Sequence, residues 1–242
     1  MVMNGLLLCA RYALAPNLLK YCGPIHTDTL SGYMSEKLAD KGLQEYLSQF
    51  ETLYPYLRFI AAENGISDPF DPRVVEAYWI GNDLLSRISM KQFWGHLLQD
   101  QSLKKKIPTT MLKWVIGKVP KGALPHHSFH VLNVFLRTGH HAVAHTLLTM
   151  DSCLIGWGKV QSSKNRVLTV ETQQLSYKDS QLFFQDRVIK NLAIPISSDD
   201  SFQPGEYVSY HWNSVCERVN EGQVRNLKKY TLWHLQLANQ TI

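Results

Sequence analysis

The stretch 125–160 reads PHHSFHVLNVFLRTGHHAVAHTLLTMDSCLIGWGKV, and the character of the chain changes within it. Six of the ten histidines fall between His126 and His145. Cys153 follows at the point where a helical pattern gives way to a strand-like one. Because potential metal ligands gather here, we place the candidate functional site in this stretch.

Before this stretch the sequence predicts helices. Apolar residues recur at three- to five-residue spacings from Leu30 to Leu47. Asp71 can cap a helix that runs to Leu85, with Pro72 as its first residue. We predict further helices over Met90–Gln99, Thr110–Ile116, Ser128–Arg137 and Ala142–Leu148.

After residue 150, segments rich in β-branched and aromatic residues predict short strands. These segments are Leu154–Val160, Arg166–Thr172, Gln174–Phe184, Gln185–Ile194 and Glu206–Trp212. An amphipathic helix from about Glu221 to Ala238 follows. The predicted fold is therefore α+β, with an all-helical domain over 1–150 and a small OB-like β-barrel with a C-terminal helix over 151–242.

Composition excludes several classes of protein. Of the 242 residues, 45% are hydrophobic and 19% are charged, and no apolar run approaches the roughly 20 residues of a membrane span. The net charge of +5 divides into +4 for 1–150 (15 basic, 11 acidic) and +1 for the rest (10 basic, 9 acidic). Neither part has the excess typical of a nucleic-acid binder. We expect a cytoplasmic protein without a membrane or nucleic-acid partner, in which the Lys104–Lys106 run is a solvated helix end.

The histidines suggest a metal site. His126 and His130 are four residues apart, as are His141 and His145, so each pair would share one face of a helix. Neither pair stands in an HExxH frame, and structural or surface roles for His140, His141 and His145 remain the competing interpretation. Because they follow a proline, His126 and His127 can also begin the helix rather than lie within it.

Three residues of the helical part are alternative ligands or supporting groups. Glu76 lies among apolar residues, where it could bind a metal or, the interpretation we favour, pair with Arg11 or Arg73. Cys22 is a further thiol, although a buried cysteine usually acts as a small hydrophobic residue. The four cysteines are far apart and form no CxxC pair, so neither a zinc knuckle nor a disulfide framework is indicated.

Cys153 and His211 are the strongest candidates in the second part. A thiolate at the start of a strand is accessible and fixed in position, as a soft-metal ligand requires. In the strand that contains His211, alternation places Tyr207, Ser209 and His211 on one face and the more apolar residues on the other. We therefore expect His211 to face outward or into a cleft.

From Cys153 to its end the chain resembles the HypC/HupF family of nickel-iron hydrogenase maturation chaperones. CLIGWGKV keeps the cysteine, glycine, lysine and valine of that family's opening motif, with Trp157 in place of its proline, and PGEYVSYHW keeps the glycine and histidine of a later strand. The resemblance implies an OB-like barrel in which the cysteine, with the histidine, carries iron bearing cyanide and carbon monoxide. Those roles fall on Cys153 and His211. The whole chain is also similar to an uncharacterised, hydrogenase-associated bacterial family.

These observations support three hypotheses. The first is a maturation or metal-delivery accessory protein that holds iron, or an iron cyanide/carbonyl complex, through Cys153 and His211. Its partner would be a hydrogenase large subunit or another maturation protein, and it has no assigned catalytic residue. The second is a metalloenzyme whose helical domain binds iron or haem through His126, His127 and His130. The third is a metal-free protein-binding module.

Overall fold

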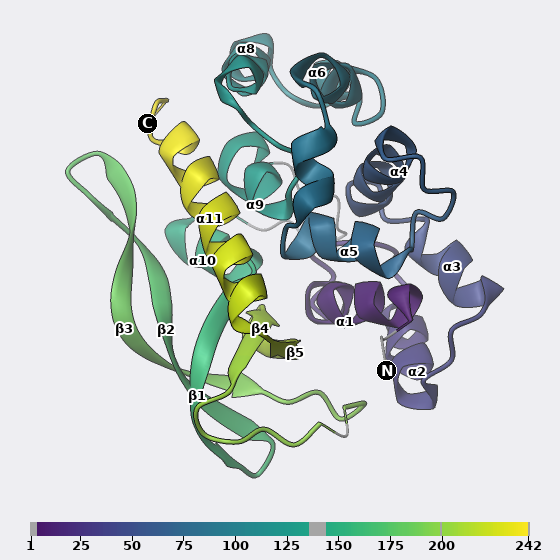
Figure 1. Cartoon of the computed structure of the whole chain (residues 1–242), viewed down its shortest axis with the longest axis vertical. Helices are drawn as coiled ribbons and strands as arrows, with labels where there is room; N and C mark the ends of the chain where they lie inside the picture. The colour runs from purple at the N-terminus through teal and green to yellow at the C-terminus, as the bar shows by residue number, and fades with distance from the viewer. Residues whose placement is uncertain (1–3, 136–143, 199, 242) are drawn as a thin grey trace.

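Helices make up the first part of the chain, and a sheet with one long helix makes up the last part (Figure 1). The computed structural model describes residues 4–135, 144–198 and 200–241. The first part contains α1 (Gly5–Leu18), α2 (Thr27–Glu36), α3 (Lys41–Leu47), α4 (Leu53–Glu63), α5 (Pro72–Trp79), η1 (Asp83–Arg87), α6 (Met90–Leu98), α7 (Leu103–Lys106), α8 (Thr109–Gly117), η2 (Val119–Lys121), α9 (His127–Phe129), η3 (His130–Val134) and α10 (Leu147–Cys153). The last part contains β1 (Gly156–Lys164), β2 (Val167–Lys178), β3 (Gln181–Ala193), β4 (Tyr207–His211), β5 (Ser214–Val219) and α11 (Glu221–Ala238). The predicted α+β class is confirmed.

Several helix boundaries follow from local chemistry. Asp71 caps α5 and Pro72 is its first residue, both as predicted. The helix ends at Trp79 rather than at Leu85, because Gly81 adopts a φ of +92°, which belongs to the left-handed region. No helix in the described ranges has both the length and the apolar character that crossing a bilayer requires.

The start of the predicted helix Ala142–Leu148 lies outside the described residues. Within the described part, α10 begins only at Leu147, with Thr146 as its cap. It continues to Cys153 and so passes the predicted change at residue 150. The C-terminal helix, by contrast, has the bounds that the amphipathic pattern predicted.

The five strands of the described residues form one sheet that closes into a barrel in the order β1-β2-β3-β5-β4. Neighbouring strands are antiparallel except β3 and β5, which meet at the single parallel pair Ala193 and Ser214. The long β2–β3 hairpin turns at Asp179 and Ser180, whose positive φ angles fit the twist of a tight hairpin. Figure 1 shows this hairpin extending beside α11, and β3 contacts that helix.

Two strand predictions are wrong for identifiable reasons. At the expected break between Thr172 and Gln174, the β2–β3 pairing has a β-bulge in which Gln173 of β2 faces two residues of β3, Asp186 and Arg187, so the register shifts without ending β2. The chain instead reverses within the segment predicted as Gln174–Phe184. β5 was not predicted, because the turn before it consists of Trp212 and Asn213, and a tryptophan with positive φ is not a usual turn signal.

The hydrophobic core is continuous from the helices into the sheet. The interior of the barrel has its own cluster, which includes Leu168, Val170 and Val208. Several residues of the last part of the chain belong to the same cluster as the helical core, including Ile155, Trp157, Cys216, Val219, Leu227 and Tyr230. The division into domains over 1–150 and 151–242 stays a prediction.

A buried polar network joins α9 to α11. The N–H of Leu124 donates to Nε2 of His234 (3.2 Å), so the proton of the neutral His234 ring lies on Nδ1 and is donated to Ser128 Oγ (2.8 Å). The Ser128 hydroxyl can then donate to Nδ1 of His126 (2.7 Å). Burial lowers the pKa of His126 to about 3. Burial, followed by repulsion from His126, lowers the pKa of His234 well below its usual value.

Burial of neutral histidines predicts acid sensitivity. Burial is the first cause of a lowered pKa at five histidines: His96, His126, His127, His211 and His234. Below pH 6.5 the unfolded chain takes up protons that the folded protein does not, so the free energy of unfolding should fall as the pH drops from 6.5 towards 5. Each histidine contributes about 1.4 kcal/mol per pH unit. Glu217 has the opposite effect on the free energy of unfolding. Burial raises its pKa to about 7, so the folded protein binds this one proton at pH values where the unfolded chain has already lost it.

Urea denaturation at pH 8, 6.5 and 5 measures this dependence. We expect His234→Gln to be less stable at pH 8 but to have a shallower pH slope, because it removes one group that the unfolded state protonates. A wild-type stability that does not change between pH 7.5 and 5 would contradict the prediction.

Candidate metal centre

His127 and His130 are presented by a short helical segment that changes its winding. In its described part the predicted helix Ser128–Arg137 is α9 followed by the π-helical segment η3, in which the wider hydrogen-bond spacing rotates the later residues relative to an α-helix. Residues 136–137 lie outside the described residues. Such π segments occur frequently at functional sites. Both rings are buried and line the same cavity.

His127 makes a hydrogen bond from each ring nitrogen. Its Nε2 lies 2.8 Å from the carbonyl oxygen of Cys153, and its Nδ1 lies 3.1 Å from the hydroxyl of Tyr78. Since a carbonyl only accepts, the proton of the neutral ring is on Nε2, and Nδ1 accepts from Tyr78. Burial first, then repulsion from His211, holds the pKa of His127 well below its ordinary value, which keeps the ring neutral.

Cys153 is the last residue of α10, not the first residue of a strand. The correction is small in space, because β1 begins three residues later at Gly156. Asp151 anchors this helix to the sheet by accepting hydrogen bonds from the N–H of Leu175 (2.8 Å) and from Lys190 Nζ (2.6 Å). These hydrogen bonds fix the end of α10, where the Cys153 side chain is half-buried.

His211 is the last residue of β4, and it points inward. Only 2% of its surface is exposed, because α1 covers this face of the sheet, so the expected cleft orientation holds and the outward one does not. Its Nδ1–H donates to the carbonyl of Tyr12 (2.7 Å). Burial lowers the pKa of His211 to about 4, although the carbonyls of Tyr12 and Cys153 act in the opposite direction.

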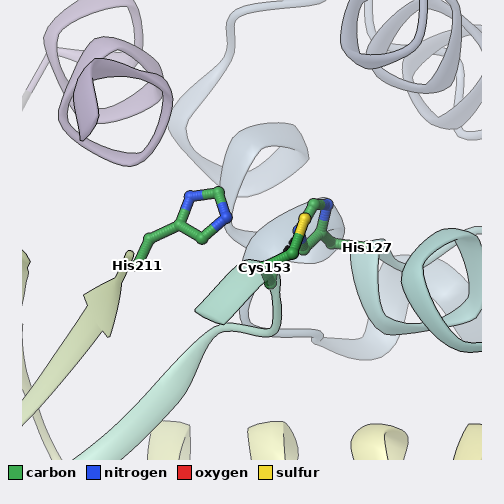
Figure 2. A group of neighbouring side chains, drawn as sticks. All are labelled: His127, Cys153 and His211. Atoms are coloured by element: carbon green, nitrogen blue, oxygen red, sulfur yellow. Dashed lines mark hydrogen bonds between the residues drawn. The ribbon is translucent and has the colours of Figure 1, made fainter. Parts of the chain in front are cut away.

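The second nitrogen of His211 has no hydrogen bond in the described part of the structure. Because Nδ1 carries the proton of the neutral ring, Nε2 offers a lone pair, and this atom is fully buried without a partner. Buried polar atoms are rarely left unsatisfied. In Figure 2 this nitrogen is turned towards Cys153 and His127.

The donor atoms of His127, Cys153 and His211 converge. One ligand atom from each lies within 4.8 Å of the other two. The centre of an equilateral triangle of that side is about 2.8 Å from each corner, and metal bonds to nitrogen and sulfur are about 2.0–2.3 Å long, so shifts of about half an ångström would complete a site. Side-chain rotations supply shifts of this size.

A cavity of about 50 Å³ adjoins these three side chains. Its walls are mainly aromatic rings, which belong to Tyr21, Phe50, Tyr78, Trp79 and Trp212. A water molecule needs about 10–15 Å³ measured in this way, so the cavity has room for an ion and small ligands beside it. Among the described residues no aspartate, glutamate, lysine or arginine lines it.

The other predicted ligands separate into two groups. His130 and Cys22 line the cavity, but they are not part of the converging set. His126 does not share this cavity: as the N-cap of α9 it has an extended backbone, and its ring faces Ser128 and stacks on Tyr230. Of the two interpretations of His126, the position at the start of the helix is confirmed, and the pairing with His130 on one helix face is wrong.

Glu76 and Arg11 lie elsewhere and do not pair with each other. Glu76 accepts hydrogen bonds from the side-chain amides of Asn82 (3.0 Å) and Gln223 (2.8 Å), so the favoured ion pair with Arg11 or Arg73 is not formed. Arg11 instead pairs with Asp200 at 2.8 Å. A neutral amide pair satisfies the Glu76 carboxylate without burying a second charge. His140 and His141 lie outside the described residues, and His145 is exposed.

Tyr78, Trp79 and Tyr12 were not predicted from the sequence. Tyr78 orients His127, Trp79 stands 4.6 Å from the His127 ring and 5.7 Å from the His211 ring, and the Tyr12 carbonyl orients His211. The only local signal was the apolar and aromatic run in the Glu76 helix. Nothing in that run indicates which histidine it contacts.

One protein-family model matches the chain, over residues 1–242, and it is described as "Family of unknown function (DUF6390)". No curated protein and no solved structure has a significant match to the sequence.

The position of Cys153 depends on a close approach at Gly156. A Cβ at this residue would overlap the ring of Tyr210, whose hydroxyl is held by Thr172 (2.9 Å). We expect Gly156→Ala to lower the free energy of unfolding by about 1–3 kcal/mol through overpacking. Gly95→Ala is the matched control, since open space surrounds that helical position and the substitution should raise stability by up to about 1 kcal/mol. Equal effects of the two changes in urea denaturation would contradict this interpretation.

Proposed function

This chain belongs to the DUF6390 family, whose function is unknown, and from its site we propose that it binds one transition-metal ion through His127, Cys153 and His211 and holds it for another protein. The observation that carries the proposal is the convergence of three soft or borderline donors, one of which is a buried imidazole nitrogen with no hydrogen bond. A neutral His211 gains a partner for this lone pair when a metal binds.

The donor set narrows the choice of metal. Imidazole suits zinc, copper, iron and nickel, and a thiolate favours the softer members of that group. Three protein ligands leave a fourth position open, whereas structural zinc sites are closed by four. The resemblance to HypC/HupF supports iron, and the cavity beside the donors has room for diatomic ligands such as cyanide or carbon monoxide.

The surroundings favour holding a metal over catalysing a reaction. Zinc hydrolases of the HExxH type use a glutamate as general base, and in the described structure no carboxylate lines this cavity. Aromatic walls instead exclude water from the ion. We propose that the closed sheet is an OB-like barrel related to that of HypC/HupF, and that the recipient is a hydrogenase large subunit or another maturation protein.

The haem hypothesis has less support. A cavity of about 50 Å³ cannot take a porphyrin without large rearrangement, and His126 faces away from it. A metal-free binding module remains the outcome if no metal binds.

Anaerobic titration with Co²⁺ and with Fe²⁺ tests the proposal. We expect one ion per chain and, with Co²⁺, a thiolate-to-metal charge-transfer band in the near ultraviolet. Cys153→Ser should abolish that band, and Cys153→Ser and His211→Gln should each weaken binding by roughly a hundredfold or more, because even outer partners of metal ligands contribute 10- to 100-fold.

His145→Gln, at an exposed histidine, and Cys22→Ser, at a cavity thiol outside the converging set, are the controls. Both should retain the ion and the band. Binding that is unchanged in Cys153→Ser would exclude the proposed site.

The hydroxyl of Tyr78 competes with a metal for Nδ1 of His127. If the bond from Nε2 to the Cys153 carbonyl is kept, the metal must take Nδ1 and displace this hydroxyl. Tyr78→Phe should therefore bind Co²⁺ about two- to tenfold more tightly, which is the value of one ordinary hydrogen bond. Tyr56→Phe is the control, since the Tyr56 hydroxyl is buried beside Tyr78 without a partner in the described structure. Weaker binding by Tyr78→Phe would show that Nε2 is the ligand.

A further inference from the structure

All of the net positive charge of the chain lies in one segment, 89–121. This segment contains seven lysines, one aspartate and no arginine, so its net charge is +6. The other 209 residues contain 18 basic and 19 acidic residues, a net charge of −1. The net charge of +4 summed over residues 1–150 does not show that the positive charge is concentrated in this segment.

The segment folds into one end of the helical part. It forms α6, α7, α8 and η2, and α7 contacts both α6 and α8. Figure 1 shows α6 and α8 at one edge of the molecule, away from the sheet. Its one acidic side chain, Asp100, is already hydrogen-bonded to His96 at 2.8 Å. We call this end, residues 89–121, the basic end.

Most of these lysines are available at the surface. Lys118 is buried, with Nζ at 2.8 Å from Thr241, and Lys106 lies 3.7 Å from Glu51. The remaining five are exposed: Lys91, Lys104, Lys105, Lys113 and Lys121. The basic end therefore presents several unneutralised cations within a short length of chain.

Large apolar side chains stand among these cations. Met90 and Trp94 are one turn apart on α6 and are 56% and 45% exposed, and Lys91 is three residues before Trp94 and so next to it on the helix surface. Trp114, on α8 next to Lys113, is 57% exposed. Exposed indoles beside lysines are characteristic of surfaces that lie at a bilayer interface, where the ring occupies the headgroup region.

We propose that the basic end docks this protein on an anionic lipid surface. Clusters of four to eight basic residues bind acidic headgroups, and lysine suits this role as a compact, hydrated charge. Protein interfaces, in contrast, are enriched in arginine and depleted in lysine. The inference is independent of the metal site, because none of the three proposed ligands lies in this segment.

Co-sedimentation with vesicles tests the proposal. In 50 mM NaCl the protein should sediment with vesicles of phosphatidylcholine and phosphatidylglycerol (70:30) and not with phosphatidylcholine alone, and 500 mM NaCl should release it. Lys104→Ala/Lys105→Ala should weaken binding at least tenfold, since each lysine near an anionic surface contributes about fivefold in affinity. Trp114→Ala should weaken binding without changing its salt dependence.

The matched control is Lys228→Ala/Lys229→Ala, which removes two adjacent exposed lysines from α11. It should bind as the wild type does. The proposal is overturned if the protein fails to bind anionic vesicles at 50 mM NaCl, or if both double variants lose binding equally. Tighter binding to a single-stranded uridine 20-mer than to the vesicles at the same salt would assign the surface to RNA instead.

Discussion

The hydrogen bond from Nε2 of His127 to the carbonyl of Cys153 connects the helical part to the entrance of the sheet, and the candidate site depends on it. Since the carbonyl can only accept, the bond fixes both the position and the tautomer of the imidazole. It also holds the backbone of Cys153 against the ring, which keeps the thiol beside the cavity. Without this bond, α9 and the end of α10 would present their side chains to each other in no fixed geometry.

A second constraint is that the rings of this core must stay neutral. Burying a charged imidazole would be costly, and at His127 and His211 this effect of burial outweighs the backbone carbonyls, which act to raise the pKa of both rings. His127 and His234 have hydrogen bonds at both ring nitrogens, whereas His211 has one only at Nδ1. At His211 the nitrogen without a hydrogen bond lies at the cavity, where a neutral lone pair is the form that a metal ion requires.

Sequence reasoning predicted the helix-then-sheet order, α11 and the α5 cap, because each depends on a local pattern. It identified Cys153 and His211 as candidate metal ligands from strand alternation and a family resemblance. It failed at His126, because the rule of four-residue spacing holds only within a helix, and this residue precedes one. It also missed Tyr12, since its contact with His211 joins residues 199 apart and has no local pattern.

The proposed ligands come from α9, the end of α10 and β4, which makes the site a product of the tertiary fold. Bringing His127, Cys153 and His211 together closes long loops of chain, and folding meets that entropic cost before any ion arrives. An ion that binds only this arrangement would stabilise the contact between the helices and the sheet through linkage. Conversely, separating α1 from β4 would remove the carbonyl that orients His211 and weaken the site. The packing between α1 and β4 is therefore the contact on which the orientation of His211 depends most directly.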